Sequence, residues 1–294
     1  ETKLGKHLTL RNYQEAFSRN FGLVTPAEQE ILRNKKVAIC GMGGVGGGHL
    51  VSLARLGVGQ FHIADPDVFE PVNFNRQYGA MVSNIGKSKV EVMAKIAQDI
   101  NPEIKLKIFK EPISENNMHE FLDGCDLFID AIDAFVVGLR YHLFGLARQK
   151  GIYSITAGPM GYSTGWVSFS PHGMSFSEYA QIFPELSDLD KVLRFLMSVA
   201  PSGLHWKHII DPSYVRLKEQ RGPSTGAACL LASGVITIES LKVLVGRGNI
   251  LSAPYYHQFD PWSYRFVSKQ LRWGNRGPLQ KLKLALFKKK VESL

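Results

Sequence analysis

A short apolar run that leads directly into a glycine-rich loop constrains this sequence more than any other feature. Residues 36–40 have the composition of a buried strand, and residues 41–48 contain six glycines. Apolar side chains at helical spacing follow in residues 49–56, and a second strand pattern ends in Asp65. Strand, glycine loop, helix and strand make one βαβ unit, which predicts a parallel sheet with a right-handed crossover.

The alternation of strand and helix patterns continues further along the chain. Helical spacing is found in residues 89–100 and 139–150, and buried-strand patterns are found in residues 126–130 and 152–156. After Gly158 the sequence becomes rich in turns and β-forming residues. We therefore predict an α/β fold, in which a Rossmann-like, doubly wound, mainly parallel sheet carries a turn-rich antiparallel C-terminal extension.

The formal net charge of +9 is concentrated at the C-terminal end of the sequence. Residues 265–294 hold nine Lys and Arg against Glu292 alone, so the preceding residues are nearly neutral. This near-neutral part carries no specific nucleic-acid signal. The three cysteines are widely spaced and form no Cys-x-x-Cys pair, which is typical of a reducing compartment, and we expect a cytoplasmic protein.

The glycine loop matches a pattern that binds the phosphates of nucleotides. Gly41-x-Gly43-x-x-Gly46 is the dinucleotide fingerprint, and Asp65 lies where an acid that binds ribose is expected. Glycines let the backbone approach a phosphate, while the N-terminus of the following helix supplies N–H donors and a positive dipole end. The loop by itself leaves an NAD(P) or FAD oxidoreductase open as an alternative.

Four further residues favour a nucleoside triphosphate. They are Asn73, Arg76, Lys89 and Asp133. A dinucleotide pyrophosphate is served by backbone amides, whereas a triphosphate that loses pyrophosphate calls for cations and for an acid that holds magnesium. We therefore expect ATP and Mg²⁺ as the ligands of this site.

These motifs together resemble the ThiF/MoeB family of ATP-dependent carboxylate-activating enzymes, to which the adenylyltransferase folds of ubiquitin-activating enzymes belong. Each matching piece is common alone, but the combination is specific. The resemblance covers residues 13–248. The matching pieces are Gly41-Met42-Gly43-Gly44-Val45-Gly46, Asp65-Pro66-Asp67, Glu70, Asn73, Arg76-Gln77, Gly86 to Lys89, Asn101-Pro102 and Asp130-Ala131-Ile132-Asp133.

The resemblance implies a role for each matching site residue. Asp65 would hold the ribose hydroxyls, and Asp133 would bind magnesium beside the reacting phosphorus. Catalysis by Arg76, Lys89 and Asp133 would consist mainly of charge neutralisation and alignment. The residues that would contact the phosphates are Gly41, Gly43, Gly44, Gly46, Asn73, Arg76 and Lys89.

The reaction that the resemblance implies is attack of a carboxylate oxygen on the α-phosphorus of ATP, which gives an acyl adenylate and releases pyrophosphate. The implied substrate is the C-terminus of a small ubiquitin-like or sulfur-carrier protein, and the implied assembly is a homodimer. In many relatives the arginine of an N-terminal Tyr-x-Arg motif reaches the ATP site of the partner subunit. Here the motif reads Tyr13-Gln14-Glu15, and Arg19 is the nearest candidate for that contact.

Departures from the family pattern leave alternatives open. No cysteine lies in residues 171–222, where relatives that form a thioester keep theirs, so we expect adenylation without a catalytic cysteine. Ala134 stands where the family has Asn, and the arginine that normally follows is displaced, which leaves Arg140 as its substitute. The alternatives are adenylation of a small-molecule, peptide or tRNA-linked carboxylate, an NAD(P)/FAD oxidoreductase, and a non-catalytic nucleotide-binding scaffold.

We divide the sequence into three parts. Residues 1–34 form a helical N-terminal lead-in, residues 35–248 a ThiF-like ATP-binding adenylation domain with a crossover excursion at 171–222, and residues 249–294 a basic C-terminal tail. In the tail, Leu279, Leu282 and Leu286 share one face of an expected helix. Three roles are open for this helix, which are packing on the body, docking on an acidic partner, and lying on a membrane surface.

Overall fold

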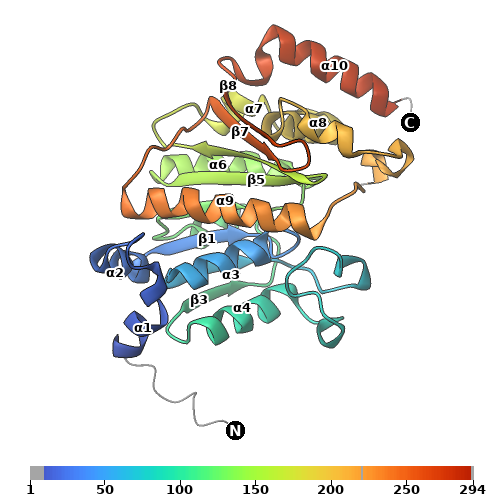
Figure 1. Ribbon diagram of the computed structural model, residues 1–294. Coiled ribbons are helices and arrows are strands. Elements are labelled where there is room, and N and C mark those ends of the chain that lie inside the picture. The colour runs from blue at the N-terminus through green and yellow to red at the C-terminus, as the bar shows by residue number, and fades with distance from the viewer. Residues whose placement is uncertain (1–9, 220, 293–294) are drawn as a thin grey trace.

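Eight strands form one mixed sheet in the computed structural model, which describes residues 10–219 and 221–292 (Figure 1). The strand order is β3-β2-β1-β4-β5-β6-β7-β8, with parallel pairing from β3 to β5 and antiparallel pairing from β5 to β8. This confirms the predicted mainly parallel sheet with an antiparallel extension. The strands are β1 (Lys36–Cys40), β2 (Gln60–Ala64), β3 (Lys105–Phe109), β4 (Leu127–Asp130), β5 (Tyr153–Met160), β6 (Ser163–Phe169), β7 (Tyr255–Asp260) and β8 (Arg265–Gln270).

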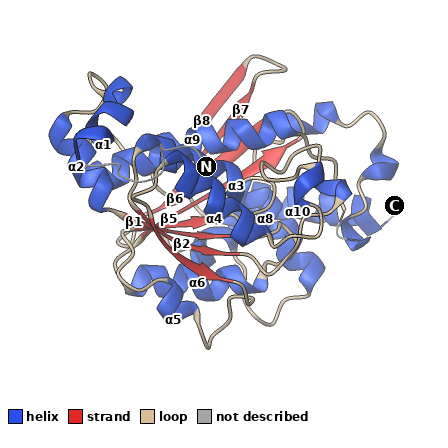
Figure 2. Cartoon of the chain, turned by 90° about the horizontal axis from the view of Figure 1, so that it is seen from below, coloured by secondary structure: helices blue, strands red, loops and turns tan. Residues whose placement is uncertain are grey.

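Helices cover both faces of this sheet. Figure 2 shows α3, α4 and α9 on one side of the strands and α5 and α6 on the other. The helices of the described residues are α1 (Leu10–Ala16), α2 (Pro26–Asn34), α3 (Gly46–Leu56), α4 (Lys89–Ile100), α5 (Met118–Phe121), α6 (Gly138–Gln149), α7 (Phe176–Ala180), α8 (Asp188–Val199), α9 (Gly226–Val245) and α10 (Pro278–Glu292).

The central strands supply apolar side chains to a core on each face. Successive residues of a strand point to opposite faces, so a strand covered on both sides is apolar throughout. In β1, Val37 and Ile39 join the core beneath α3, α4 and α9, while Ala38 and Cys40 join the core beneath α6, α7 and α8. This double burial explains why residues 36–40 read as an unbroken apolar run.

Helix α9 is the one helix in the described ranges that is long and apolar enough to cross a membrane. Here it packs against α3, β5 and β6. A Cβ at Gly48 of α3 would lie 2.4 Å from the Ser233 Oγ of α9, so the two helices are in close contact. Thr225 caps the start of α9 by accepting a hydrogen bond from the Ala228 N–H, and Gly246 ends the helix in a left-handed conformation. A core helix therefore accounts for this apolar segment.

Residues 249–292 continue the same sheet and then add a helix. The sequence patterns did not predict β7 and β8, which extend the antiparallel side of the sheet. Helix α10 packs on α8, where Lys283 Nζ donates to the Pro201 carbonyl (2.9 Å) and Lys288 Nζ pairs with Asp190 Oδ1 (2.8 Å). Of the three roles left open for the tail helix, packing on the body is the one that these contacts show for this face of α10.

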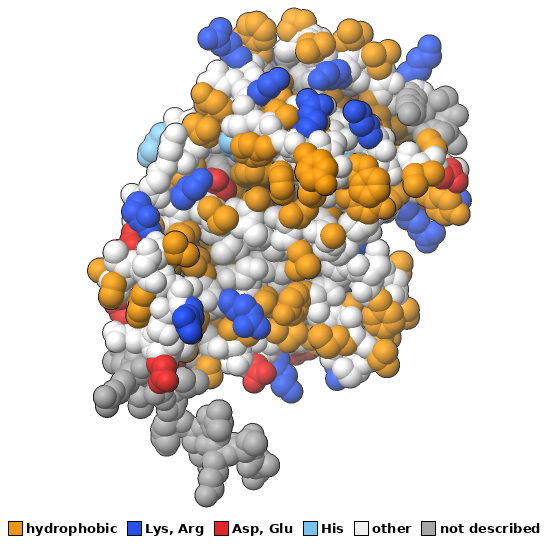
Figure 3. Space-filling model, viewed as in Figure 1, with side chains coloured by type: hydrophobic (Ala, Val, Ile, Leu, Met, Phe, Trp, Pro, Cys, Tyr) orange, Lys and Arg blue, Asp and Glu red, His pale blue; other side chains and the backbone are white. Residues whose placement is uncertain are grey.

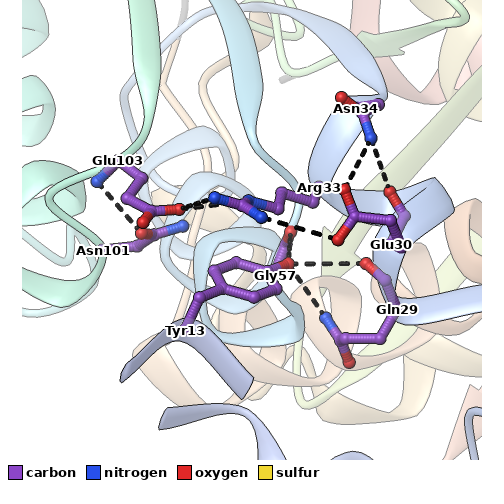
Figure 4. Close-up of polar contacts among 8 residues, drawn as sticks. All are labelled: Tyr13, Gln29, Glu30, Arg33, Asn34, Gly57, Asn101 and Glu103. Carbon is purple, nitrogen blue, oxygen red and sulfur yellow. Dashed lines mark hydrogen bonds and ion pairs between the residues drawn. The ribbon is translucent and has the colours of Figure 1, made fainter. Parts of the chain in front are cut away.

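The N-terminal helices α1 and α2 are attached to the sheet domain through Tyr13 (Figure 4). The buried Tyr13 hydroxyl donates to the Gly57 carbonyl (2.7 Å) and accepts from Gln29 Nε2 (3.1 Å). The Arg33 guanidinium lies 4.8 Å from the centre of the Tyr13 ring and pairs with Glu103 (2.7 Å). These contacts connect α1 and α2 to the residues that follow α3 and α4.

The Tyr13 hydroxyl gives a first testable prediction. We expect Tyr13→Phe to lower the free energy of unfolding by about 1–3 kcal/mol, because the Gly57 carbonyl would lose its partner in a buried position. Urea unfolding monitored by circular dichroism measures the change. The exposed neighbour Gln14→Ala is the control and should leave the midpoint unchanged. An unchanged midpoint in Tyr13→Phe would show that this hydrogen bond does not hold the lead-in.

Candidate nucleotide-binding site

The predicted site lies at the carboxyl edge of the parallel strands. The glycine loop joins the end of β1 to the start of α3, Asp65 directly follows β2, and Asp130 ends β4. Strand β1 lies between β2 and β4, so the direction of the crossovers reverses at this point. Open α/β sheets bind ligands in the crevice at such a switch point. The fold thus brings together residues that are far apart in the sequence.

Two glycines of the loop are required by the fold itself. Gly41 has a φ of 102°, and a Cβ there would lie 2.1 Å from the Ala131 carbonyl oxygen. A Cβ at Gly46 would lie 1.8 Å from the Gly41 carbonyl oxygen. Both distances are far shorter than any real contact, so no side chain fits at either position. These glycines let β1, β4 and the N-terminus of α3 approach one another.

The other two predicted glycines are not required by the surrounding protein. A Cβ at Gly43 would come no closer than 3.6 Å to Gln77 Nε2, and one at Gly44 would lie 3.4 Å from Cys229 Sγ. Neither glycine has a positive φ. The fold could therefore accept alanine at both positions, and the open surface that they leave fits close approach of a phosphate to the backbone.

Asp65 connects the end of β2 to the glycine loop. Its Oδ2 accepts a hydrogen bond from the Met42 N–H (2.6 Å), and its Oδ1 accepts one from the Asp67 N–H (2.8 Å). Burial raises the pKa of Asp65, and these two backbone hydrogen bonds act in the opposite direction. A carboxylate oxygen can accept more than one hydrogen bond, so capacity for a ribose hydroxyl is left. The predicted ribose contact fits this geometry and stays a prediction.

The predicted cations lie on the segment that follows Asp65. Arg76 lies beside the loop, 3.8 Å from the position of a Gly44 Cβ, and its Nη1 donates to the Val72 carbonyl (3.0 Å). Lys89 is buried at the start of α4 and pairs with the exposed Asp67 (3.0 Å). Arg76 therefore lies beside the loop. Lys89 would have to break its ion pair with Asp67 in order to bind a phosphate.

Two further polar residues complete this segment. Asn73 is buried, and its Oδ1 accepts a hydrogen bond from the Glu70 N–H (2.9 Å), so in this structure it supports the turn. Gln77 is also buried, and its Oε1 meets no hydrogen-bond partner among the described residues. The sequence reasoning gave Gln77 no role, although it stands next to Arg76 in the motif. Its position beside Gly43 makes it an additional candidate ligand contact.

The loop after β4 carries Asp133 to the same edge. Asp133 is exposed, and its Oδ1 accepts a hydrogen bond from the Phe135 N–H (2.9 Å). No group of three or more metal-binding side chains exists in residues 10–219 and 221–292. Magnesium at nucleotide sites is usually held by one or two carboxylates together with phosphate oxygens, so the single carboxylate of Asp133 fits such a site.

A buried ion pair holds the Asp133 loop in place. Arg140 Nε donates to Asp130 Oδ2 (2.8 Å), and its Nη1 donates to the Asp133 carbonyl (2.9 Å). The Thr156 hydroxyl also donates to Asp130 Oδ2 (2.8 Å), and the guanidinium lies 3.9 Å from the centre of the Phe195 ring. The structure thus shows Arg140 as a positioning residue. The sequence analysis named Asp130 in a motif but gave it no role, and it missed Thr156, whose partner lies on the neighbouring strand β4.

Arg19 lies far from the glycine loop of its own chain. It is exposed in the turn after α1, which attaches to Gly57 at the end of α3. The loop is at the other end of α3, about 16 Å away for a helix of this length. A contact between Arg19 and a nucleotide would thus require another subunit, and this stays a prediction.

None of the three cysteines is arranged as a nucleophile. Cys40, Cys125 and Cys229 are all buried. Burial raises the pKa of each thiol, that of Cys125 to about 12. Only the thiolate attacks efficiently, and these thiols stay protonated at neutral pH. The geometry agrees with a site that works without a cysteine.

Comparison with known proteins gives a consistent result. The family model described as the ThiF family matches residues 17–278. The tRNA threonylcarbamoyladenosine dehydratase of Haemophilus influenzae is 37% identical over 154 residues, which are 52% of this chain and 58% of that protein. The SAMP-activating enzyme E1 of Haloferax volcanii is 33% identical over 129 residues, which are 44% of this chain and 47% of that protein.

A solved structure shows the same fold. A crystal structure of E. coli MccB with ATP has a TM-score of 0.67 and 20% sequence identity, and the match covers 90% of this chain and 72% of that one. The match to curated relatives is shorter, since the chain spans about half the length of the proteins named above. The relatives therefore identify the fold and the family of this chain, and they do not identify its substrate.

The two classes of glycine give a second prediction. We expect Gly43→Ala to keep the thermal unfolding midpoint, because the Cβ would make only ordinary contact with Gln77, and to weaken ATP·Mg²⁺ binding about tenfold or more, because the methyl group would stand where a phosphate approaches the backbone. Gly46→Ala is the matched variant and should lower the free energy of unfolding by about 1–3 kcal/mol or more. Calorimetric titration and thermal melts measure both. If Gly43→Ala bound ATP·Mg²⁺ with unchanged affinity, the glycine loop would not bind the phosphates.

The buried ion pair gives a third prediction. Arg140→Met should lower the free energy of unfolding by about 3–5 kcal/mol, because the Asp130 carboxylate would stay buried without its counter-charge. The double variant Asp130→Asn/Arg140→Met should recover part of that loss, since it removes both charges. Urea unfolding of the single and double variants completes the cycle. Additive effects of the two substitutions would show that the pair is not coupled.

Proposed function

This chain belongs to the ThiF family, and we propose that it uses ATP and magnesium to adenylate a carboxylate at the C-terminus of a small ubiquitin-like or sulfur-carrier protein. The observation that carries the proposal is the half-exposed backbone of Gly43 and Gly44 beside Arg76, at the same sheet edge as Asp133. Family membership favours a nucleoside triphosphate over the NAD(P) or FAD alternative. The products would be an acyl adenylate and pyrophosphate.

The residues of the site would act by charge neutralisation and alignment. Backbone N–H groups of the loop and the N-terminus of α3 would hold the phosphates, and Arg76 and Lys89 would neutralise them. Asp65 would bind the ribose. Magnesium, held by Asp133, would offset the charge that develops on the leaving pyrophosphate. A carboxylate oxygen of the acceptor would then attack the α-phosphorus without the help of a protein nucleophile.

A groove beside the site offers a place for the acceptor. It is lined by residues 208–211 with Tyr214, Arg216 and residues 221–223 of the crossover excursion. The excursion returns to the site edge at Ser224, whose carbonyl accepts a hydrogen bond from Asn75 Nδ2 (2.9 Å), next to Arg76. Ile210 and Tyr214 are exposed there. An extended C-terminal peptide in this groove would bring its carboxylate toward the nucleotide.

The burial of all three thiols supports a reaction that ends at the adenylate. The activated acyl group would pass to an external acceptor, because no cysteine side chain in this chain is accessible to receive it. A homodimer would complete each site with Arg19 of the other subunit. This assembly is part of the proposal.

A tRNA-linked carboxylate is the second candidate substrate. It is favoured by the identity to the Haemophilus influenzae protein, whose name states that it acts on threonylcarbamoyladenosine in tRNA. The near-neutral charge of residues 1–264 favours the protein substrate instead, since RNA-binding surfaces are usually basic. Both candidates require the same adenylation chemistry, so one assay with two acceptors distinguishes them.

The fourth prediction concerns Asp133. Exchange of labelled pyrophosphate into ATP should depend on a carboxylate acceptor, and Asp133→Asn should reduce it about 100-fold or more, because the magnesium ligand loses its charge. Asparagine keeps an oxygen that can accept the Phe135 N–H, so the loop should stay folded.

The control for this assay is the exposed Asp123→Asn on the α5–β4 loop, which should exchange like the wild type. A ubiquitin-like protein that ends in Gly-Gly and a tRNA bearing threonylcarbamoyladenosine are the two acceptors to compare. Full exchange in Asp133→Asn would remove Asp133 from the mechanism. Tight binding of NADH without binding of ATP would overturn the proposed function.

A further inference from the structure

Helix α10 has two apolar faces, and the body of the protein covers only one of them. On the inner face Gln280 and Val291 are buried, and the Phe287 ring packs edge-on against Trp206. On the outer face Leu279, Leu282 and Leu286 are 65%, 57% and 61% exposed. Their spacing places them in one row along the helix. We call these three residues the outer leucine row.

Exposed basic residues precede the outer leucine row in the sequence and interleave with it. The exposed cations nearest in the chain are Arg272, Arg276, Lys281 and Lys289. Trp273 is also half exposed, and the sequence from Arg265 to Val291 contains no acidic residue. Figure 3 shows orange apolar and blue basic side chains together at the end of the molecule that α10 forms.

The inner contacts hold this outer face in a defined orientation. Lys283 and Lys288 bind the Pro201 carbonyl and Asp190, and Gln280 Nε2 lies 3.3 Å from the buried Asn275 Oδ1. The helix is therefore docked on α8 through its inner face, and the outer leucine row points away from the body. The three leucines of the outer leucine row therefore do not contribute to the packing of α10 on the body.

We propose that the outer leucine row docks the protein on the surface of an anionic lipid bilayer. A helix with a row of exposed leucines and with lysines between them, preceded by an exposed tryptophan and two exposed arginines, is suited to the boundary between headgroups and acyl chains. The leucines would enter this boundary, and the cations would meet the anionic headgroups.

The shape of the surface favours a bilayer over an acidic protein. Helix α10 is the outermost element of the molecule, at the end opposite to α1 (Figure 1). The outer leucine row is a convex ridge, which a protein partner could bury only by supplying a matching apolar groove. A bilayer accommodates a ridge without a preformed groove, and its anionic lipids match the exposed cations of residues 272–289. The glycine loop follows β1, and strands β4 and β5 separate β1 from the antiparallel strands β6 to β8. Docking through α10 should therefore leave nucleotide binding unchanged.

Vesicle sedimentation with the full chain tests the proposal. The protein should sediment with phosphatidylglycerol–phosphatidylcholine vesicles and stay in solution with vesicles of phosphatidylcholine alone. The variant Leu279→Gln/Leu282→Gln/Leu286→Gln should bind the anionic vesicles at least about tenfold more weakly, and Lys281→Glu/Lys289→Glu should do the same. Leu230→Gln on α9 is the matched control, since Leu230 is also 61% exposed, and it should bind like the wild type.

Two further measurements make the test decisive. Thermal melts and ATP·Mg²⁺ titration should be unchanged in all variants, because every substituted side chain is exposed. Equal binding to both kinds of vesicle, or undiminished binding by the leucine variant, would overturn the proposal. A third result would also overturn the proposal. If light scattering showed that the wild type is a dimer and the leucine variant a monomer, and neither protein sedimented with vesicles, the outer leucine row would bind a second copy of the chain.

Discussion

The close approach of three backbone segments at the end of β1 is the constraint on which the site depends. Gly41 lies against the Ala131 carbonyl, and Gly46 lies against the Gly41 carbonyl, with no room for a side chain at either glycine. This contact places the N-terminus of α3 beside the loop that follows β4. The N-terminus of α3 and the loop that carries Asp133 therefore lie at the same edge of the sheet. A larger residue at either glycine would separate them.

Asp133 and Arg76, two of the residues assigned to chemistry, are more open than the residues that build the site. Asp130, Arg140 and Thr156 are buried and hydrogen-bonded to one another, and Asp65 fixes the glycine loop through the Met42 N–H. Asp133 is exposed, and Arg76 is half buried. Charged groups that hold the backbone need partners in a low-dielectric interior, whereas groups that bind a ligand must stay open to it. The separation applies to Asp133 and Arg76, because Lys89, which is also assigned to the phosphates, is buried and paired with Asp67.

The antiparallel part of the sheet connects the nucleotide site to the rest of the molecule. Strands β6, β7 and β8 extend the sheet, α8 packs on β5 to β7, and α10 packs on α8. The crossover excursion returns to the site edge at Ser224 and continues into α9. The C-terminal residues are thus part of the folded body, although their composition suggested only a basic tail. Lys283 and Lys288 bind this body, whereas Arg272, Lys289 and other basic side chains are exposed on it.

The sequence by itself determined the βαβ unit, the mainly parallel sheet and the motif residues at its carboxyl edge. These features depend on local spacing, because the hydrophobic periods of strands and helices and the glycine pattern are all found within short stretches of sequence. Only the tertiary structure decided which glycines the fold needs, that Lys89 pairs with Asp67, and that Arg140 binds Asp130 and the Asp133 loop. It also decided that β7 and β8 join the sheet and that one face of α10 stays exposed. The physical reason is that these outcomes depend on contacts between distant segments, which local periodicity does not encode.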